Sequence, residues 1–302
     1  MIYLGFDGIG YRTGLASSDD LVNWRKQGMI IDRGPVGSPT QHGIGMNSIL
    51  RDNQLFGPGT PKKVAGKYVG TYHAYPQPGY ESGPGVIGLC FSEDLRRWEP
   101  RGPILAPDPH NEWESSGLYK SWLMEDKGMF HLFYNAKNSP NWPWCEQIGL
   151  ALSRDLVNWT RHPLNPILRV GPKGEFDDMF AADPCVLKHE DTWVMFYFGN
   201  CSDGAAREGA AFSEDLLSWR KSKEILIDVG PAGSVDSLYA HKPGIIAGNG
   251  RLFHFYCAVS PAASHQGNAM AGSQTRGITF ACGGNLAENP ANPADGPLTN
   301  RC

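Results

Sequence analysis

Six ionisable side chains stand at matched distances before three tyrosines of the sequence. Three acidic residues precede the tyrosines by twenty residues, and a lysine, an aspartate and a second lysine precede them by fourteen. The acids are Glu114, Asp177 and Asp236, the second set is Lys120, Asp183 and Lys242, and the tyrosines are Tyr134, Tyr197 and Tyr256. Burying such groups costs several kcal/mol per unpaired ion, so a set that converges points to binding or acid–base catalysis.

A repeat in the sequence indicates which strands and loops carry these side chains. The phrase Ser-x-Asp-Leu-x-x-Trp occurs four times and ends at Trp24, Trp98, Trp159 and Trp219. Each copy follows a short apolar run, and an earlier run ends in or near an aromatic pair, as in residues 130–134 and 193–197. Residues 252–256 and 277–281 imply a fifth unit without the phrase. Because the repeat is present throughout, we expect it to serve the architecture, with Asp bonding the backbone of its own turn.

Short strands repeated about every 60 residues predict an all-β, five-bladed β-propeller with almost no helix. Tyr3 aligns with Tyr197, so the chain is expected to begin at the second strand of its first blade, whose inner strand is missing. The last blade is incomplete as well. We expect the propeller to cover residues 1–281 and residues 282–302, rich in Asn, Pro, Ala and Gly, to form a loose tail.

Composition excludes several classes of protein. The 302 residues include 37 Gly and 23 Pro, which favours short strands and turns over helices, and a net charge of −4 argues against broad nucleic-acid binding. No apolar window of membrane-spanning length occurs, and the odd number of cysteines without Cys-x-x-Cys predicts no zinc site. Without a signal peptide the chain reads as cytoplasmic, whereas an N-terminal truncation would leave secretion or the periplasm open.

The inner strands of a propeller line its central channel, and Lys120, Asp183 and Lys242 begin three of them by this counting. In the second blade Thr60–Pro61 is the expected match to Asp183–Pro184. We expect the acids Glu114, Asp177 and Asp236 on the loops that enter these strands. Further side chains expected to contact a ligand are Asp178, His241, Glu146, Arg207 and Trp122, beside Lys120, Lys242 and Asp177.

The phrase Ile-Gly-Leu-Ala-x-Ser-x-Asp-Leu-x-x-Trp at residues 148–159, and Phe176–Asp177 followed by Asp183–Pro184-x-Val186, resemble the five-bladed propeller glycosidases of glycoside hydrolase families 32, 43, 62, 117 and 130. The resemblance covers residues 1–281 and does not select one family. It implies a sugar pocket at one mouth of the channel, served by carboxylates, and an exo-acting glycoside hydrolase for a short oligosaccharide. The chain departs from the family 43 pattern, because the first inner strand is absent and Lys120 and Lys242 stand on two others.

Glycoside cleavage needs one protonated and one ionised carboxyl group, and Asp183, Glu114 and Asp236 are the candidates. Lys120 and Lys242 should keep Asp183 ionised as base, nucleophile or stabiliser. Glu114, beside Trp113, is the first choice for the acid and Asp236 the second.

Two alternatives stay open. Lysine and histidine side chains suit phosphate, which would make the reaction a phosphorolysis. A non-catalytic carbohydrate-binding propeller would fit the loss of the first inner strand. No cofactor is expected, although Ca²⁺ in the channel would leave no sequence signature. The partner is expected to be a small saccharide. The sequence leaves the sugar, the linkage and the oligomeric state undetermined.

Overall fold

The computed structural model describes residues 1–262 and 274–283, and these form strands almost throughout. The single helical element among them is a short 3₁₀ turn, Glu112–Glu114. The chain divides into two compact units: unit 1 contains Met1–Asp52 and Thr60–Ile167, and unit 2 contains Asn53–Gly59 and Leu168–Cys302. Most of the predicted tail, residues 284–302, lies outside the described residues. No helix in the described part is long and apolar enough to cross a membrane.

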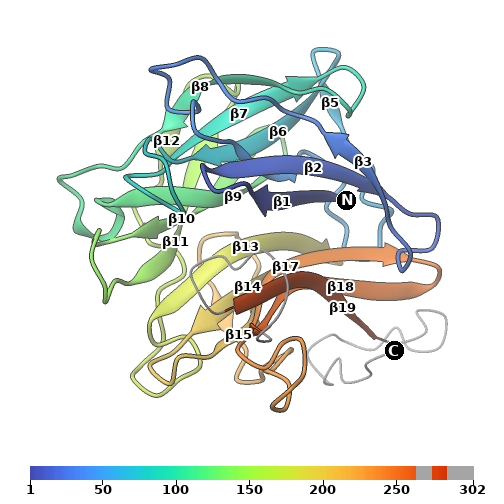
Figure 1. Ribbon diagram of the computed structural model, residues 1–302, viewed down its shortest axis with the longest axis vertical. Helices are drawn as coiled ribbons and strands as arrows, with labels where there is room; N and C mark the ends of the chain where they lie inside the picture. Colours follow the sequence, from blue (N-terminus) through green and yellow to red (C-terminus); the bar gives the residue numbers. More distant parts are fainter. Residues whose placement is uncertain (263–273, 284–302) are drawn as a thin grey trace. The chain divides into compact units, whose positions relative to one another are not determined.

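Unit 1 holds three groups of mostly antiparallel strands, coloured blue to green in Figure 1. The first group is β1 (Ile2–Phe6), β2 (Tyr11–Ser17) and β3 (Arg25–Met29). The second runs β4 (Gly45–Ile49), β6 (Lys67–Ala74), β7 (Val86–Ser92) and β8 (Glu99–Leu105), with β5 (Lys63–Val64) paired to β6. The third is β9 (Gly117–Asp126), β10 (Met129–Lys137), β11 (Glu146–Ser153) and β12 (Thr160–Arg161).

Unit 2 repeats this arrangement twice. One group is β13 (Phe180–His189), β14 (Thr192–Asn200), β15 (Ala206–Ser213) and β16 (Arg220–Lys221). The other is β17 (Tyr239–Gly248), β18 (Arg251–Pro261) and β19 (Gln274–Gly283), joined to the first where Ala206 pairs with Tyr239. The all-β prediction is therefore confirmed, while the count of five blades and their incompleteness stay predictions.

One cross-strand pair recurs from group to group. A tyrosine lies directly opposite a glycine in four of the hairpins: Tyr3 opposite Gly14, Tyr72 opposite Gly88, Tyr134 opposite Gly149 and Tyr197 opposite Gly209. A Cβ atom at Gly88 would come within 2.2 Å of the Tyr72 ring, and one at Gly149 within 2.7 Å of the Tyr134 ring. The glycines are required because an aromatic ring occupies the space of a side chain: the ring of the facing tyrosine at Gly14, Gly88 and Gly149, and the ring of Phe176 at Gly209.

The recurring Ser-x-Asp-Leu-x-x-Trp phrase forms a turn, as predicted. In the first copy Asp20 Oδ1 accepts hydrogen bonds from the backbone amides of Val22 and Asn23. The leucine of every copy adopts the left-handed conformation, with φ of 64°, 64°, 64° and 67° at Leu21, Leu95, Leu156 and Leu216. These bonds lower the pKa of the aspartates, as at Asp94, where the amide of Arg97 contributes most.

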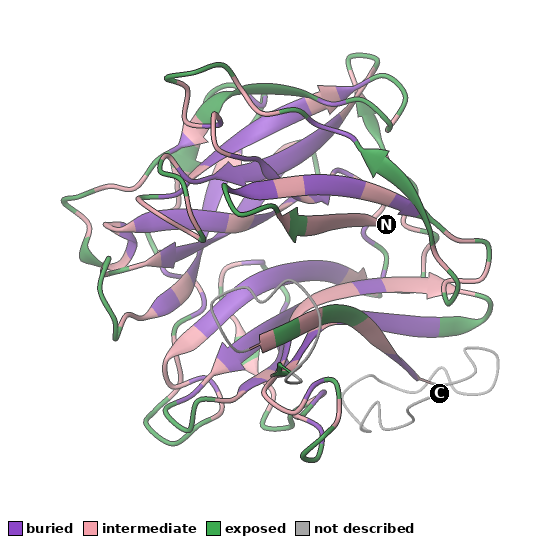
Figure 2. Cartoon of the chain, in the orientation of Figure 1, coloured by how far each residue is buried: buried purple, intermediate pink, exposed green. Residues whose placement is uncertain are grey.

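Buried residues follow the middle of the strands, and exposed residues follow the connections (Figure 2). One core cluster of unit 1 is mostly aliphatic and includes Ile87, Leu118, Leu123 and Leu132. Unit 2 packs aromatic and small residues in its clusters, among them Ala182, Phe198 and Tyr256. The strands thus form rigid supports for the side chains at their ends.

Candidate functional site

Lys120, Asp183 and Lys242 occupy the same structural position in three hairpins. Each lies at a β-bulge in the first strand of its hairpin, where the register with the second strand shifts. Their φ angles are 47°, 54° and 69°, in the left-handed region that residues other than glycine seldom adopt. The equal spacing to the tyrosines therefore reflects one shared bulge, and strained positions of this kind cluster at functional sites.

The corresponding position in the second group was predicted wrongly. The bulge of β4 lies between Met46 and Ile49, so Asn47 and Ser48 take the place assigned to Thr60–Pro61. Pro61 instead forms an isolated bridge with Arg51. That match failed because β4 and β6 are separated by residues 50–66, a longer connection than those of the other hairpins.

In unit 2, Asp183 and the neighbouring inner strand form an ionic and aromatic group. The Asp183 carboxylate lies 3.7 Å from the Lys242 ammonium, and only 9% of the residue is exposed. His241 Nδ1 is 2.9 Å from the carbonyl oxygen of Cys257, and because a carbonyl oxygen only accepts, Nδ1 is the donor and carries a proton. The rings of Phe198 and Tyr239 meet the imidazole edge to face at 5.4 Å and 5.7 Å. The group is held in place from four strands, β13, β14, β17 and β18.

A second ionisable pair in unit 2 was not found from the sequence. Glu208 on β15 and His254 on β18 are in close contact through Oε2 and Nε2, and both side chains are buried. Burial raises the pKa of Glu208, the contact with His254 opposes this rise, and the nearby Asp183 carboxylate adds to it. Aligning the repeats by their Tyr–Gly pairs would have shown an acid and a histidine at positions that carry no ionisable side chain in the other hairpins.

The loop acids Glu114, Asp177 and Asp236 make equivalent contacts. Each accepts a hydrogen bond from the tyrosine twenty residues later: Tyr134 at 3.0 Å, Tyr197 at 2.9 Å and Tyr256 at 2.8 Å. Arg161 also bonds Glu114, and Lys221 pairs with Asp177. All three carboxylates are buried. These surroundings favour a role in fastening each loop to its hairpin over the catalytic role predicted for Glu114 and Asp236.

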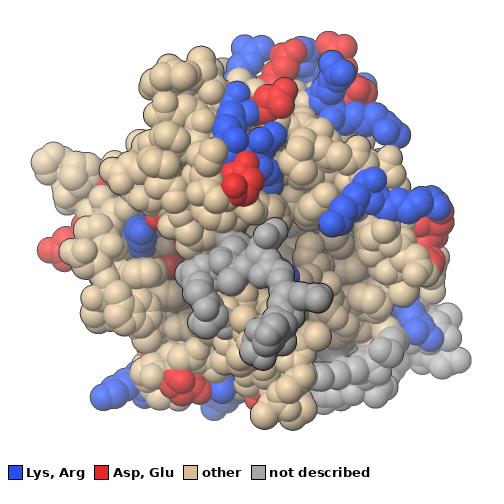
Figure 3. Space-filling view, viewed as in Figure 1, with Lys and Arg blue, Asp and Glu red and all other residues tan. Residues whose placement is uncertain are grey.

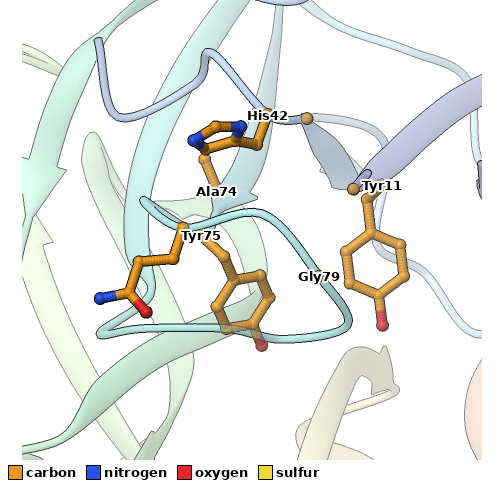
Figure 4. Close-up of a pocket in the computed structure, with 8 residues that line it drawn as sticks. Tyr11, His42, Ala74, Tyr75 and Gly79 are labelled. Atoms are coloured by element: carbon orange, nitrogen blue, oxygen red, sulfur yellow. The ribbon is translucent and has the colours of Figure 1, made fainter. Parts of the chain in front are cut away.

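Unit 1 carries an aromatic cluster next to two acidic residues, Glu81 and Glu146. Tyr11 and Tyr75 are buried and their rings lie 6.2 Å apart, and Tyr11 donates a hydrogen bond of 2.6 Å to Glu81. The Lys120 ammonium lies 5.1 Å from the centre of the Tyr11 ring. Figure 4 shows a small pocket beside this cluster, where the hydroxyl groups of Tyr11 and Tyr75 point the same way and His42 lines another wall.

Glu146 continues this cluster toward the surface. It accepts a hydrogen bond of 2.8 Å from Trp144, and its charge is one of the causes, after burial, that raise the pKa of Tyr119. Trp142 packs edge to face on Trp144 at 5.0 Å and is 61% exposed. Aromatic faces beside carboxylates are typical of small-molecule sites.

The remaining predicted contacts have other partners. Arg207 pairs with Asp203 at 2.9 Å and Asp228 at 2.8 Å, and its hydrogen bond lowers the pKa of Asp203 to about 2. Asp178 accepts bonds from the loop amides of Gly174 and Ser202. The Arg51 guanidinium lies 5.2 Å from the Trp122 ring.

No cluster of three or more metal-ligating side chains occurs within residues 1–262 and 274–283. On the face drawn in Figure 3, acidic and basic side chains are intermingled, in keeping with the small net charge.

The family model described as "Glycosyl hydrolases family 32 N-terminal domain" matches residues 53–235, which is more than half of the chain. The chain belongs to this family. The predicted resemblance to the propeller glycoside hydrolases is thus confirmed. The match includes Asp183, Glu208 and the three copies of the turn phrase that end at Trp98, Trp159 and Trp219.

The chain is also similar to curated proteins and to solved structures. A 1,2-beta-oligomannan phosphorylase of Thermoanaerobacter sp. (strain X514) is 32% identical over 146 residues, which are 47% of this chain and 39% of that protein. The chain spans less than half the length of the first curated relatives it matches. A solved complex of BT0996 with RGII is 29% identical with a TM-score of 0.78, and the likeness covers 96% of this chain and 85% of that protein. A second solved structure, named only as a glycoside hydrolase, is 28% identical with a TM-score of 0.76, covering 99% and 86%.

Proposed function

We propose that the chain is an exo-acting glycoside hydrolase that cleaves a glycosidic bond of a short oligosaccharide, on a five-bladed propeller whose first and last blades are incomplete. Membership of a glycosyl hydrolase family supports the reaction class. The observation that carries the proposal is Asp183, a carboxylate held at a left-handed bulge of an inner strand next to the Lys242 ammonium.

Asp183 serves as the ionised carboxylate of the reaction. It lies 3.7 Å from the Lys242 ammonium, and the bulge directs it away from the regular hydrogen-bond ladder. An ionised carboxylate activates water for attack on the anomeric carbon, or attacks that carbon itself, and it stabilises the positive charge that develops on the sugar ring. His241, with its ring fixed by the Cys257 carbonyl, supplies a hydrogen-bonding group from the adjacent strand.

We assign sugar binding in unit 1 to the aromatic cluster and its charged neighbours. Tyr11 and Tyr119 combine buried apolar rings with polar tips, and Glu146 and Lys120 carry an acceptor and a donor for sugar hydroxyl groups. Trp142, the most exposed aromatic of this cluster, offers a face for stacking a ring.

Phosphorolysis is the second candidate. The relative named 1,2-beta-oligomannan phosphorylase supports it, and the bulge lysines and His241 carry the charge and donors that phosphate requires. Phosphate would then take the place of water at the anomeric carbon, so turnover would depend on added phosphate and release a sugar phosphate.

The test is a screen of the purified chain against aryl glycosides and oligosaccharides, with and without phosphate, followed by Asp183→Asn. We expect the wild type to turn over at least one substrate without phosphate, and the variant to lose activity while keeping its Tm. Wild-type-like turnover in the folded variant would remove Asp183 from the mechanism. Binding of a saccharide without turnover of any glycoside would favour the carbohydrate-binding alternative.

A further inference from the structure

Two positions of unit 2 carry ionisable side chains where the second and third strand groups of unit 1 carry aliphatic ones. Glu208 precedes the glycine opposite Tyr197, and the matching residue before Gly88 is Ile87. His254 stands two residues before Tyr256, and the matching residue before Tyr134 is Leu132. Ile87 and Leu132 belong to one aliphatic core cluster of unit 1. The fold is therefore compatible with aliphatic residues at both positions, and it does not require the acid and the histidine.

Burying these two ionisable side chains costs free energy, and not all of their polar atoms have hydrogen-bond partners. Glu208 is 0% exposed and His254 is 2% exposed. Among the described residues, neither Glu208 Oε1 nor His254 Nδ1 has a hydrogen-bond partner, although both atoms are buried. Replacing such a pair by well-packed apolar residues is often neutral or stabilising, so its presence favours a role other than stability.

The surroundings of the pair favour one shared proton. Glu208 and His254 touch through a single oxygen and a single nitrogen, so one proton between them leaves the pair without net charge. The charged groups that face this pair are Asp183 on β13, which acts on Glu208, and Lys242 on β17, which pairs with Asp183. The ring of Phe196 packs edge to face on His254 at 5.6 Å and keeps that side apolar.

We propose that Glu208 and His254 hold the proton that glycoside cleavage requires, with Glu208 as the proton donor that complements Asp183 and His254 as the positioning residue. This inference rests on the proposed function. Glu208 Oε1, the oxygen without a protein partner among the described residues, is the atom from which the proton would leave. His254 keeps the carboxyl group oriented through Oε2.

The protons released and consumed in the cleavage are equal in number. As the bond between the anomeric carbon and the leaving oxygen breaks, that oxygen takes the proton of Glu208 and departs as an alcohol. Water adds its oxygen to the anomeric carbon, and its released proton passes through Asp183 or directly back to the Glu208–His254 pair. One water is consumed per bond cleaved, and both carboxyl groups return to their starting states.

Two variants separate this role from a structural one. Glu208→Ile combined with His254→Leu reproduces the residues of Ile87 and Leu132, and Glu208→Gln keeps the shape but cannot donate a carboxyl proton. Both are assayed with a dinitrophenyl glycoside, whose leaving group needs no protonation, and with an alkyl glycoside or oligosaccharide, whose leaving group does. Tm and the pH dependence of kcat/KM are measured on the same proteins.

We expect the double variant to keep or raise the Tm, and both variants to lose at least about 100-fold in kcat/KM on the alkyl substrate but less than about tenfold on the dinitrophenyl substrate. The alkaline limb of the pH profile should disappear with them. Equal losses on both substrates, or unchanged activity in a folded double variant, would overturn the proposal. Asp183→Asn should lower kcat/KM equally on both substrates, and it tests the proposed function separately.

Discussion

The hydroxyl group of Tyr197 donates a hydrogen bond of 2.9 Å to the buried carboxylate of Asp177, twenty residues earlier in the chain. The ring of Phe176 packs on the same tyrosine at 5.8 Å, and Lys221 of β16 approaches the carboxylate from the outer strand. Glu114, Trp113, Tyr134 and Arg161 repeat this arrangement in unit 1. A tyrosine hydroxyl, a loop acid and a cation thus join the loop, the second strand and the outer strand of one hairpin group.

Removing that hydroxyl should destabilise the protein measurably. Tyr197→Phe leaves the buried Asp177 carboxylate one donor short, so we expect the free energy of unfolding to fall by about 1–3 kcal/mol. Urea denaturation gives this value. Tyr3→Phe is the matched control, because Tyr3 has the same register opposite a glycine but no hydrogen bond to an acid among those found in the described residues. Equal losses in the two variants would mean that the acid contributes nothing.

The glycine opposite each tyrosine should not tolerate a methyl group. In Gly149→Ala the new Cβ would lie 2.5 Å from the Trp113 ring and 2.7 Å from the Tyr134 ring, so one of the rings must shift. Overpacking of this kind costs roughly 1–3 kcal/mol. Gly102→Ala, where nothing lies within 4 Å, is the control and should change stability by less than about 0.5 kcal/mol in the same unfolding experiment.

His254→Leu should make stability depend steeply on pH. Without the histidine, burial and Asp183 remain as the causes that raise the pKa of Glu208. A raised pKa in the folded state means that the contribution of Glu208 is full below the ordinary value of about 4.3 and is lost as pH rises through the folded value. We expect unfolding to become easier above about pH 4 in this variant than in Glu208→Ile/His254→Leu. Parallel stability curves for the two variants would contradict the prediction.

Trp142→Ala should weaken binding of longer saccharides without affecting the fold. The side chain is 61% exposed, so its loss should change the free energy of unfolding by less than about 0.5 kcal/mol. Losing one stacked ring, worth about 1 kcal/mol, raises KM about fivefold with kcat unchanged. The measurement is KM for oligosaccharides of increasing length. Val157→Ala, at an exposed residue of a turn, is the control and should leave KM as it is.

The repeat made the fold and the bulge positions predictable. Lys120, Asp183 and Lys242 were found by counting from their tyrosines, because all three hairpins share one bulge and one connection length. The matching position of the second group was wrongly placed at Thr60–Pro61, because the bulge of β4 is separated from β6 by a longer connection that local spacing does not reveal.

The roles of the acids were harder to predict than their positions. Spacing placed Glu114 twenty residues before Tyr134 but could not show that the tyrosine hydroxyl points at the carboxylate. Glu208 was overlooked for the opposite reason: its partner His254 is 46 residues away, and their contact depends on how two strand groups pack. Departures from the repeat were a better guide to function in this chain than features that every repeat shares.

The turn that contains Leu21 has a consequence for how the chain reaches its folded state. Its hydrogen bonds from Leu21 to Ser18, from Asn23 to Asp20 and from Trp24 to Leu21 each span three residues. Closing so short a loop costs little chain entropy, whereas the strand groups require contacts between distant residues. The four turns can therefore form early and independently, and each would reverse the chain before its strands have met.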